Sequence, residues 1–117
     1  MRDIDEVFTV LRQSRFRSRF HLSAKEAEYL KQKGLPVILD HARNFITTRL
    51  AAANPLNDGR QTPIKNHPVF VAQHATAACC RKCLEKWYHI PKNKPLTDDH
   101  IDYIISLIEH WLVDQRV

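Results

Sequence analysis

Glycine is nearly absent from this chain, which contains only Gly34 and Gly59 among its 117 residues. Sheet-rich domains use many tight turns with positive φ angles, and glycine is the residue that adopts those angles most easily. The scarcity of glycine therefore argues against a β-rich fold and favours helices. It also excludes a glycine-rich phosphate-binding loop and a glycine-flanked serine nucleophile, both of which need glycines at fixed spacing.

Long apolar runs are missing as well. No stretch approaches the roughly 18 uninterrupted apolar residues of a membrane span, and the acidic start of the chain does not suit a signal peptide. Cysteine is also scarce, with three residues gathered between positions 79 and 83. Because a disulfide framework spaces its cysteines along the chain, we expect a soluble protein of the reducing cytoplasm with no membrane partner.

The remaining composition is that of a folded domain. Hydrophobic residues make up 44% and charged residues 26% of the chain, and its length fits one domain spanning residues 1–117. The apolar spacing predicts an all-α, compact domain of four to five helices. One short strand at residues 69–71 is the alternative for that segment.

Local signals divide this predicted domain. Residues 1–14 should form an N-terminal helix and the start of a basic connector. Ser23 and Glu26 form a capping box that begins a helix ending at Gly34, and Pro36 starts the next one, which runs to about residue 50. Residues 51–67 are rich in turn signals and predict a loop of roughly 17 residues, a length that is usually functional or disordered. Residues 68–89 predict a buried helix that contains cysteine and histidine, and Thr97 caps the last helix.

The cysteines are the strongest candidate site. Cys80 and Cys83 have the spacing that holds tetrahedral zinc, although a single pair of this kind is a weak signal. On one straight helix Cys79 would share their face, while His74 would lie about 180° from Cys83 unless the helix begins after it. We predict Cys80, Cys83, Cys79, His74 and His67 as metal ligands, and the other candidates for completing the set are His89, His41 and His21.

Two other interpretations of the cysteines stay open. Free cysteines are often inert core residues, and these three lie among alanines. They could also act as redox or nucleophilic thiols, because Arg81, Lys82 and Lys86 are nearby cations that would stabilise a thiolate.

Several strings of residues are specific in combination. They are RSRFHL at 17–22, QTP at 61–63, HPVF at 67–70 and QHATAACCRKCLEKW at 73–87. Together they resemble an uncharacterised family of small bacterial and phage-encoded proteins, domain of unknown function 4186, from about residue 15 to the end. In that family a histidine directly follows the tryptophan, whereas here Tyr88 takes that place and His89 comes one residue later. The resemblance implies no activity.

A basic segment is the second candidate. Arg12, Arg15, Arg17 and Arg19 alternate with Phe16 and Phe20, a composition typical of single-stranded nucleic-acid contacts. In the alternative interpretation the two phenylalanines anchor the segment to the core and the arginines point outward. We therefore expect a zinc-binding module that contacts nucleic acid. The alternatives are a small metal-dependent hydrolase or thiol-based enzyme using the same cluster, and a metal-free structural or interaction domain.

Overall fold

The computed structural model describes residues 1–115 and consists of six α-helices and one short 3-10 helix, with no strand in this range. In chain order they are α1 (Ile4–Gln13), η1 (Arg17–Arg19), α2 (Ala24–Lys33), α3 (Leu35–Arg49), α4 (Pro68–Ala75), α5 (Arg81–Tyr88) and α6 (Asp98–Gln115). The all-α prediction is confirmed, although four to five helices was slightly too few. Residues 69–71 lie inside α4, so the alternative of a strand there is wrong. None of the described helices is long and apolar enough to cross a membrane.

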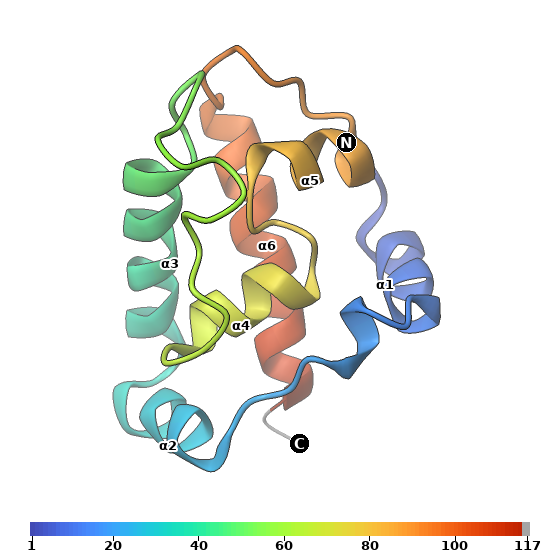
Figure 1. The fold of residues 1–117 in the computed structure, drawn as a ribbon. Helices are drawn as coiled ribbons and strands as arrows, with labels where there is room; N and C mark the ends of the chain where they lie inside the picture. Colours follow the sequence, from blue (N-terminus) through green and yellow to red (C-terminus); the bar gives the residue numbers. More distant parts are fainter. Residues whose placement is uncertain (116–117) are drawn as a thin grey trace.

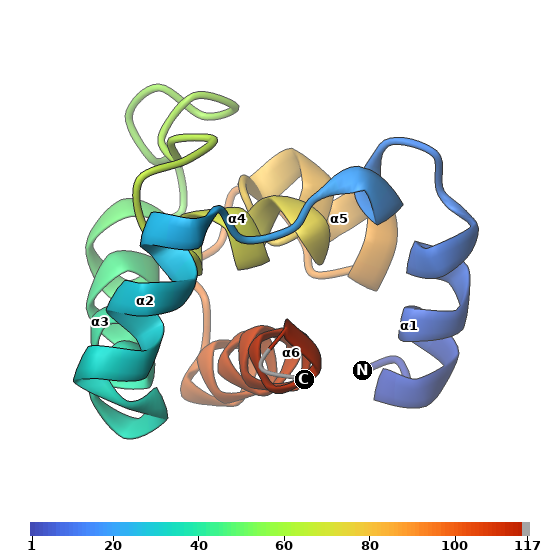
Figure 2. The same ribbon diagram turned by 90° about the horizontal axis from the view of Figure 1, so that it is seen from below.

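Helix α6 runs through the middle of the molecule, with α3 along one side and α4 and α5 crossing it (Figure 1). Viewed along α6, the helices α2 and α3 lie on one side and α1 on the other (Figure 2). Of the helix pairs, α3 and α6 share the most extensive contact. Burial of apolar side chains between these helices is the main favourable term in folding. The fully buried set includes Val7, Ile38, Ile46, Val69, Ile104, Leu107, Ile108 and Leu112.

The capping box at the start of α2 is confirmed. The Ser23 hydroxyl accepts a hydrogen bond from the Glu26 N–H at 3.2 Å, and the Glu26 carboxylate accepts one from the Ser23 N–H at 2.8 Å. The second carboxylate oxygen of Glu26 accepts a hydrogen bond from the Asn66 N–H at 2.8 Å, which ties the end of the long connection to α2. Gly34, with φ of 83°, separates α2 from α3.

The structure divides residues 68–89, for which the sequence predicted one helix, into α4 and α5. Ala77 has a left-handed φ of 59°. The Ala78 N–H donates to the Gln73 carbonyl at 2.8 Å, and the Ala77 N–H donates to the His74 carbonyl at 3.4 Å. This is the Schellman arrangement that closes helix ends, usually with glycine at the left-handed position. As a result, the first two cysteines lie at a corner between helices.

Candidate metal centre

The three cysteines meet at the start of α5. Cys79 lies in the connection from α4, Cys80 is the N-cap residue, and Cys83 is in the first turn. The Cys80 sulfur accepts a hydrogen bond from the Cys83 N–H at 3.4 Å, in the role that serine or aspartate oxygen usually plays at a helix start. The sulfurs of Cys79 and Cys83 are 3.7 Å apart. All three sulfurs lie within 4.8 Å of one another, and we call them the cysteine cluster.

Two buried polar side chains fix the backbone at this corner. Thr62 donates from its hydroxyl to the Cys79 carbonyl at 2.8 Å, and Gln73 donates from its amide to the Ala78 carbonyl at 3.1 Å. Both side chains are buried. A buried hydrogen bond of this kind holds a backbone group in place because leaving it unpaired would cost free energy. The connection from α3 to α4 therefore helps to build the cluster.

Arg81 holds the other side of the same corner. The backbone N–H of Arg81 donates a hydrogen bond to the Asp58 carboxylate at 3.0 Å, and the residue is only 1% exposed. The guanidinium donates to carbonyls in the connections on either side of it, those of Leu50, Ala52, Pro91 and Lys94. Burial lowers the pKa of Arg81. The sequence suggested that this cation would stabilise a thiolate. In the structure its guanidinium instead binds backbone carbonyls and joins the α3–α4 and α5–α6 connections to α5.

Arg17 is the cation that contacts the sulfurs. One guanidinium nitrogen donates to the His74 carbonyl at 2.7 Å and to the Cys79 sulfur at 3.7 Å. The other donates to the Cys83 sulfur at 3.4 Å. The expectation that Arg17 points to solvent or to a phosphate does not match this position. Its alternation with phenylalanine gave no signal of an inward side chain.

The cysteine cluster contains one thiol that ionises more readily than the others. Hydrogen bonds from Cys79 and Cys80, followed by the hydrogen bond and charge of Arg17, lower the pKa of Cys83. Hydrogen bonding with Cys80 and Cys83, together with burial, raises the pKa of Cys79. Of the two sulfurs that Arg17 contacts, the one with the lowered pKa is that of Cys83.

The two histidines predicted as ligands make other contacts. The His74 ring nitrogen Nε2 lies 3.0 Å from the Thr62 carbonyl, and the ring stacks on Phe20 with centroids 5.7 Å apart. His67 caps the start of α4, where its Nδ1 accepts a hydrogen bond from the backbone, and its Nε2 lies 3.1 Å from Nδ1 of His41. Neither ring belongs to the group of sulfurs that could hold an ion.

The remaining candidates lie at the surface. His89 ends α5 in a left-handed conformation, and His21 contacts only the carbonyl of Arg19 among the side-chain hydrogen bonds of the described residues.

Of the arginines predicted to bind nucleic acid, three are exposed: Arg12, Arg15 and Arg19.

A family model covers nearly this whole arrangement, because it matches residues 5–113. Its description is "Domain of unknown function (DUF4186)". This chain belongs to that family. No solved structure matches the chain. For this family member, the strings at 61–63 and 73–87 contain Thr62, Gln73 and all three cysteines, which are the residues that form the corner and the cluster. The chemistry that such a group of thiols supports is binding of a thiophilic metal.

Proposed function

We propose that this chain is a zinc-binding module in which the thiolates of Cys79, Cys80 and Cys83 hold one Zn²⁺. The observation that supports this most strongly is the spacing of the sulfurs. With Zn–S bonds of about 2.3 Å, the edge of a tetrahedral site is about 3.8 Å. The 3.7 Å between the Cys79 and Cys83 sulfurs is close to that edge, and all three sulfurs lie within 4.8 Å.

Charge balance favours zinc over monovalent copper. Three thiolates around Zn²⁺ leave one net negative charge, whereas three around Cu⁺ leave two. Within residues 1–115, one guanidinium, that of Arg17, contacts the sulfurs. Hydrogen bonds from such outer groups orient ligands and tune metal affinity. One arginine therefore matches the charge of a zinc site with three thiolates.

The fourth position of the tetrahedron is left for water or an external ligand. Within residues 1–115 the group of sulfurs includes no histidine, aspartate or glutamate. Catalytic zinc sites also keep an open position, but they use a nearby base or acid to move protons. Since no carboxylate or imidazole joins the cluster in the described part of the chain, a binding module is favoured over a hydrolase.

Metal analysis of the purified protein tests this proposal. Protein made without added metal should contain about one equivalent of zinc, and Cys83→Ser should lose it and unfold at a lower temperature, because metal binding contributes folding free energy. His74→Gln is the matched control and should keep its zinc, since the ring does not join the sulfurs. Metal-free protein whose melting temperature is unchanged by a chelator would contradict the proposal.

A further inference from the structure

An exposed aromatic ring lies beside the cysteine cluster. Phe16 is 47% exposed and is the one aromatic among the large hydrophobic side chains exposed in the described part of the chain. The guanidinium carbons of Arg17 and Arg19 lie 4.9 and 4.8 Å from its ring centroid. An arginine close to an aromatic ring is a favourable contact. The Phe20 ring also packs edge-on against Phe16 with centroids 5.3 Å apart, and the rest of the exposed Phe16 surface faces solvent.

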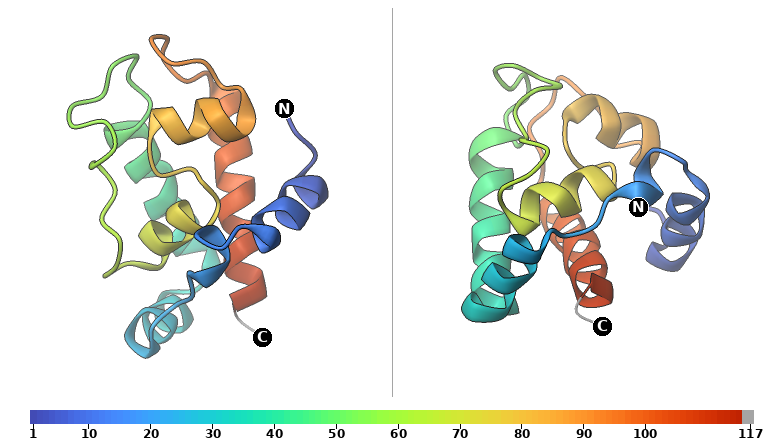
Figure 3. Two further views of the ribbon diagram at one scale, coloured as in Figure 1. Left: turned by 45° about the vertical axis from the view of Figure 1, so that its right-hand side comes forward. Right: turned by 60° about the horizontal axis from the view of Figure 1, so that its bottom comes forward.

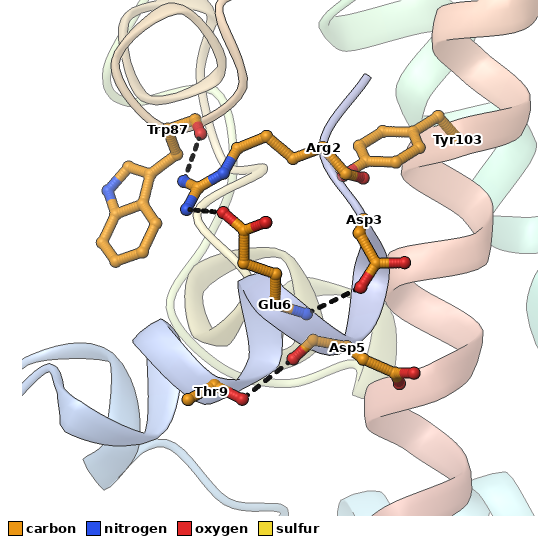
Figure 4. Close-up of polar contacts among 7 residues, drawn as sticks. All are labelled: Arg2, Asp3, Asp5, Glu6, Thr9, Trp87 and Tyr103. Atoms are coloured by element: carbon orange, nitrogen blue, oxygen red, sulfur yellow. Dashed lines mark hydrogen bonds and ion pairs between the residues drawn. The ribbon is translucent and has the colours of Figure 1, made fainter.

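Arg17 connects this ring to a second one on α5. Its guanidinium carbon lies 6.0 Å from the Trp87 ring centroid, while its nitrogens hold the cluster sulfurs. Trp87 comes four residues after Cys83 and therefore lies on the same side of α5. The Trp87 carbonyl accepts a hydrogen bond at 2.9 Å from Arg2, which fixes this end of α5 against α1 (Figure 4). Both rings thus lie within 6.0 Å of the same arginine, which is anchored on the cluster sulfurs.

Most of the exposed charges on η1, its preceding residues and α5 are positive. Arg15 directly precedes Phe16 and Arg19 follows it by three residues, and Lys82 and Lys86 lie one turn apart on α5. Two acids of neighbouring helices have cationic partners, because Glu85 of α5 pairs with Lys92 and Glu6 of α1 pairs with Arg2. A third acid, Asp114 of α6, lines the groove beside η1 together with Arg17. The segment that contains η1 passes alongside the corner between α4 and α5, so the two sets of cations belong to one region of the fold (Figure 3).

We propose that a single-stranded nucleic acid binds across η1 and α5, with Phe16 and Trp87 stacking on bases and Arg15, Arg19, Lys82 and Lys86 contacting phosphates. Aromatic platforms within a basic surface are the arrangement that single strands require, because every base offers a flat face. A duplex hides those faces, so its binding would leave Phe16 unused. This inference rests on the proposed metal site in one respect: zinc would fix the sulfurs that hold Arg17 beside both rings.

Fluorescence anisotropy with labelled oligo-dT and oligo-U of about 12 nucleotides tests the proposal on the zinc-loaded protein. Phe16→Ala should weaken binding roughly tenfold at low salt, as removal of one stacking platform does. Replacing both Arg15 and Arg19 with Ala should reduce the slope of log affinity against log salt by about 1.4, because each lost phosphate contact contributes about 0.7. The charge-matched control replaces Lys25 and Lys31 with Ala; both are exposed on α2, away from this surface (Figure 1).

Four results would count against nucleic-acid binding at this surface. No binding at low salt, an equal loss in the α2 control, tighter binding of a duplex, or heparin binding with the same pattern of variants would overturn the proposal. The zinc content of every sample is measured in parallel. Zinc at one equivalent without oligonucleotide binding would leave the metal site standing and remove only the nucleic-acid surface.

Discussion

Arg17 places one guanidinium nitrogen 3.4 Å from the sulfur of Cys83, although the two residues are 66 positions apart. The contact joins η1 to α5 and directs a permanent positive charge at the thiol whose pKa the surrounding hydrogen bonds lower. Arginine stays protonated in proteins, so it can donate to thiolate sulfur but cannot itself bind the metal. Its position suits a ligand-orienting group beside a metal.

Arg17→Met should weaken zinc binding by about 10- to 100-fold, which is the usual effect of removing a group that supports metal ligands. Competition with a chromophoric chelator measures the affinity. The matched control is Arg15→Met, which removes an exposed charge in the same segment and should leave the affinity unchanged. Equal affinities for all three proteins would show that Arg17 does not support the site.

Arg81→Met should lower the free energy of unfolding by about 3 to 5 kcal/mol, because it leaves one buried and three partly buried carbonyls without their donor. The loss should appear in urea unfolding monitored by circular dichroism. Lys82→Met, at the exposed neighbouring position, should change stability by no more than about 0.5 kcal/mol. A loss below about 1 kcal/mol for Arg81→Met would mean that the connections do not depend on this side chain.

His67 should make stability depend on pH. Burial, then the charges of His41 and Arg49, lower its pKa to about 4, and Glu26 opposes them. Its Nδ1 accepts the Val69 N–H at 3.0 Å, so the neutral ring must carry its hydrogen on Nε2. An unfolded histidine titrates near pH 6.5, so between about pH 6.5 and 4 the unfolded state binds more protons. Stability should therefore be complete above pH 6.5 and fall by about 2 kcal/mol as the pH drops through this window.

His67→Asn isolates that effect, since asparagine can also cap a helix but does not titrate. The variant should flatten the loss of stability between pH 6.5 and 4 in thermal unfolding at several pH values. If the variant loses as much stability as the wild type between pH 6.5 and 4, a group other than His67 causes the pH dependence.

His89→Gly should stabilise the protein by roughly 1 kcal/mol. His89 ends α5 with φ of 57°, and glycine adopts that left-handed conformation without the steric cost of a side chain. Zinc content should not change, because His89 is outside the cysteine cluster. Loss of zinc would restore the sequence-based candidate of His89 as a ligand.

The sequence predicted the helical fold for physical reasons that the structure shares. Apolar spacing identified α6, and the capping box of Ser23 and Glu26 identified the start of α2. It did not predict the break between α4 and α5, because the left-handed residue there is Ala77 and no glycine marks it. The local conformation is instead set by buried Gln73 and by Thr62, which is distant in the chain. Tertiary contacts of this kind have no local signal.

The candidate site was predicted only in part, because some of its contacts also depend on tertiary packing. The spacing of Cys80 and Cys83 predicted that their thiols would meet. Cys79 was expected to join them on one face of a straight helix, whereas it joins them from the connection before α5. The inward turn of Arg17 depends on the packing of η1 against α4. Its alternation with phenylalanine is compatible with either an inward or an outward side chain, so the sequence could not decide between them.

X-ray absorption at the zinc edge tests directly whether the cysteine cluster binds zinc through its sulfurs. We expect three sulfur neighbours at about 2.3 Å and one oxygen or nitrogen at about 2.0 Å from the zinc. Cys79→Ser should reduce the sulfur count by one or release the metal. Protein that binds no zinc, or zinc with no sulfur neighbours, would contradict the assignment of the cysteine cluster as a metal site.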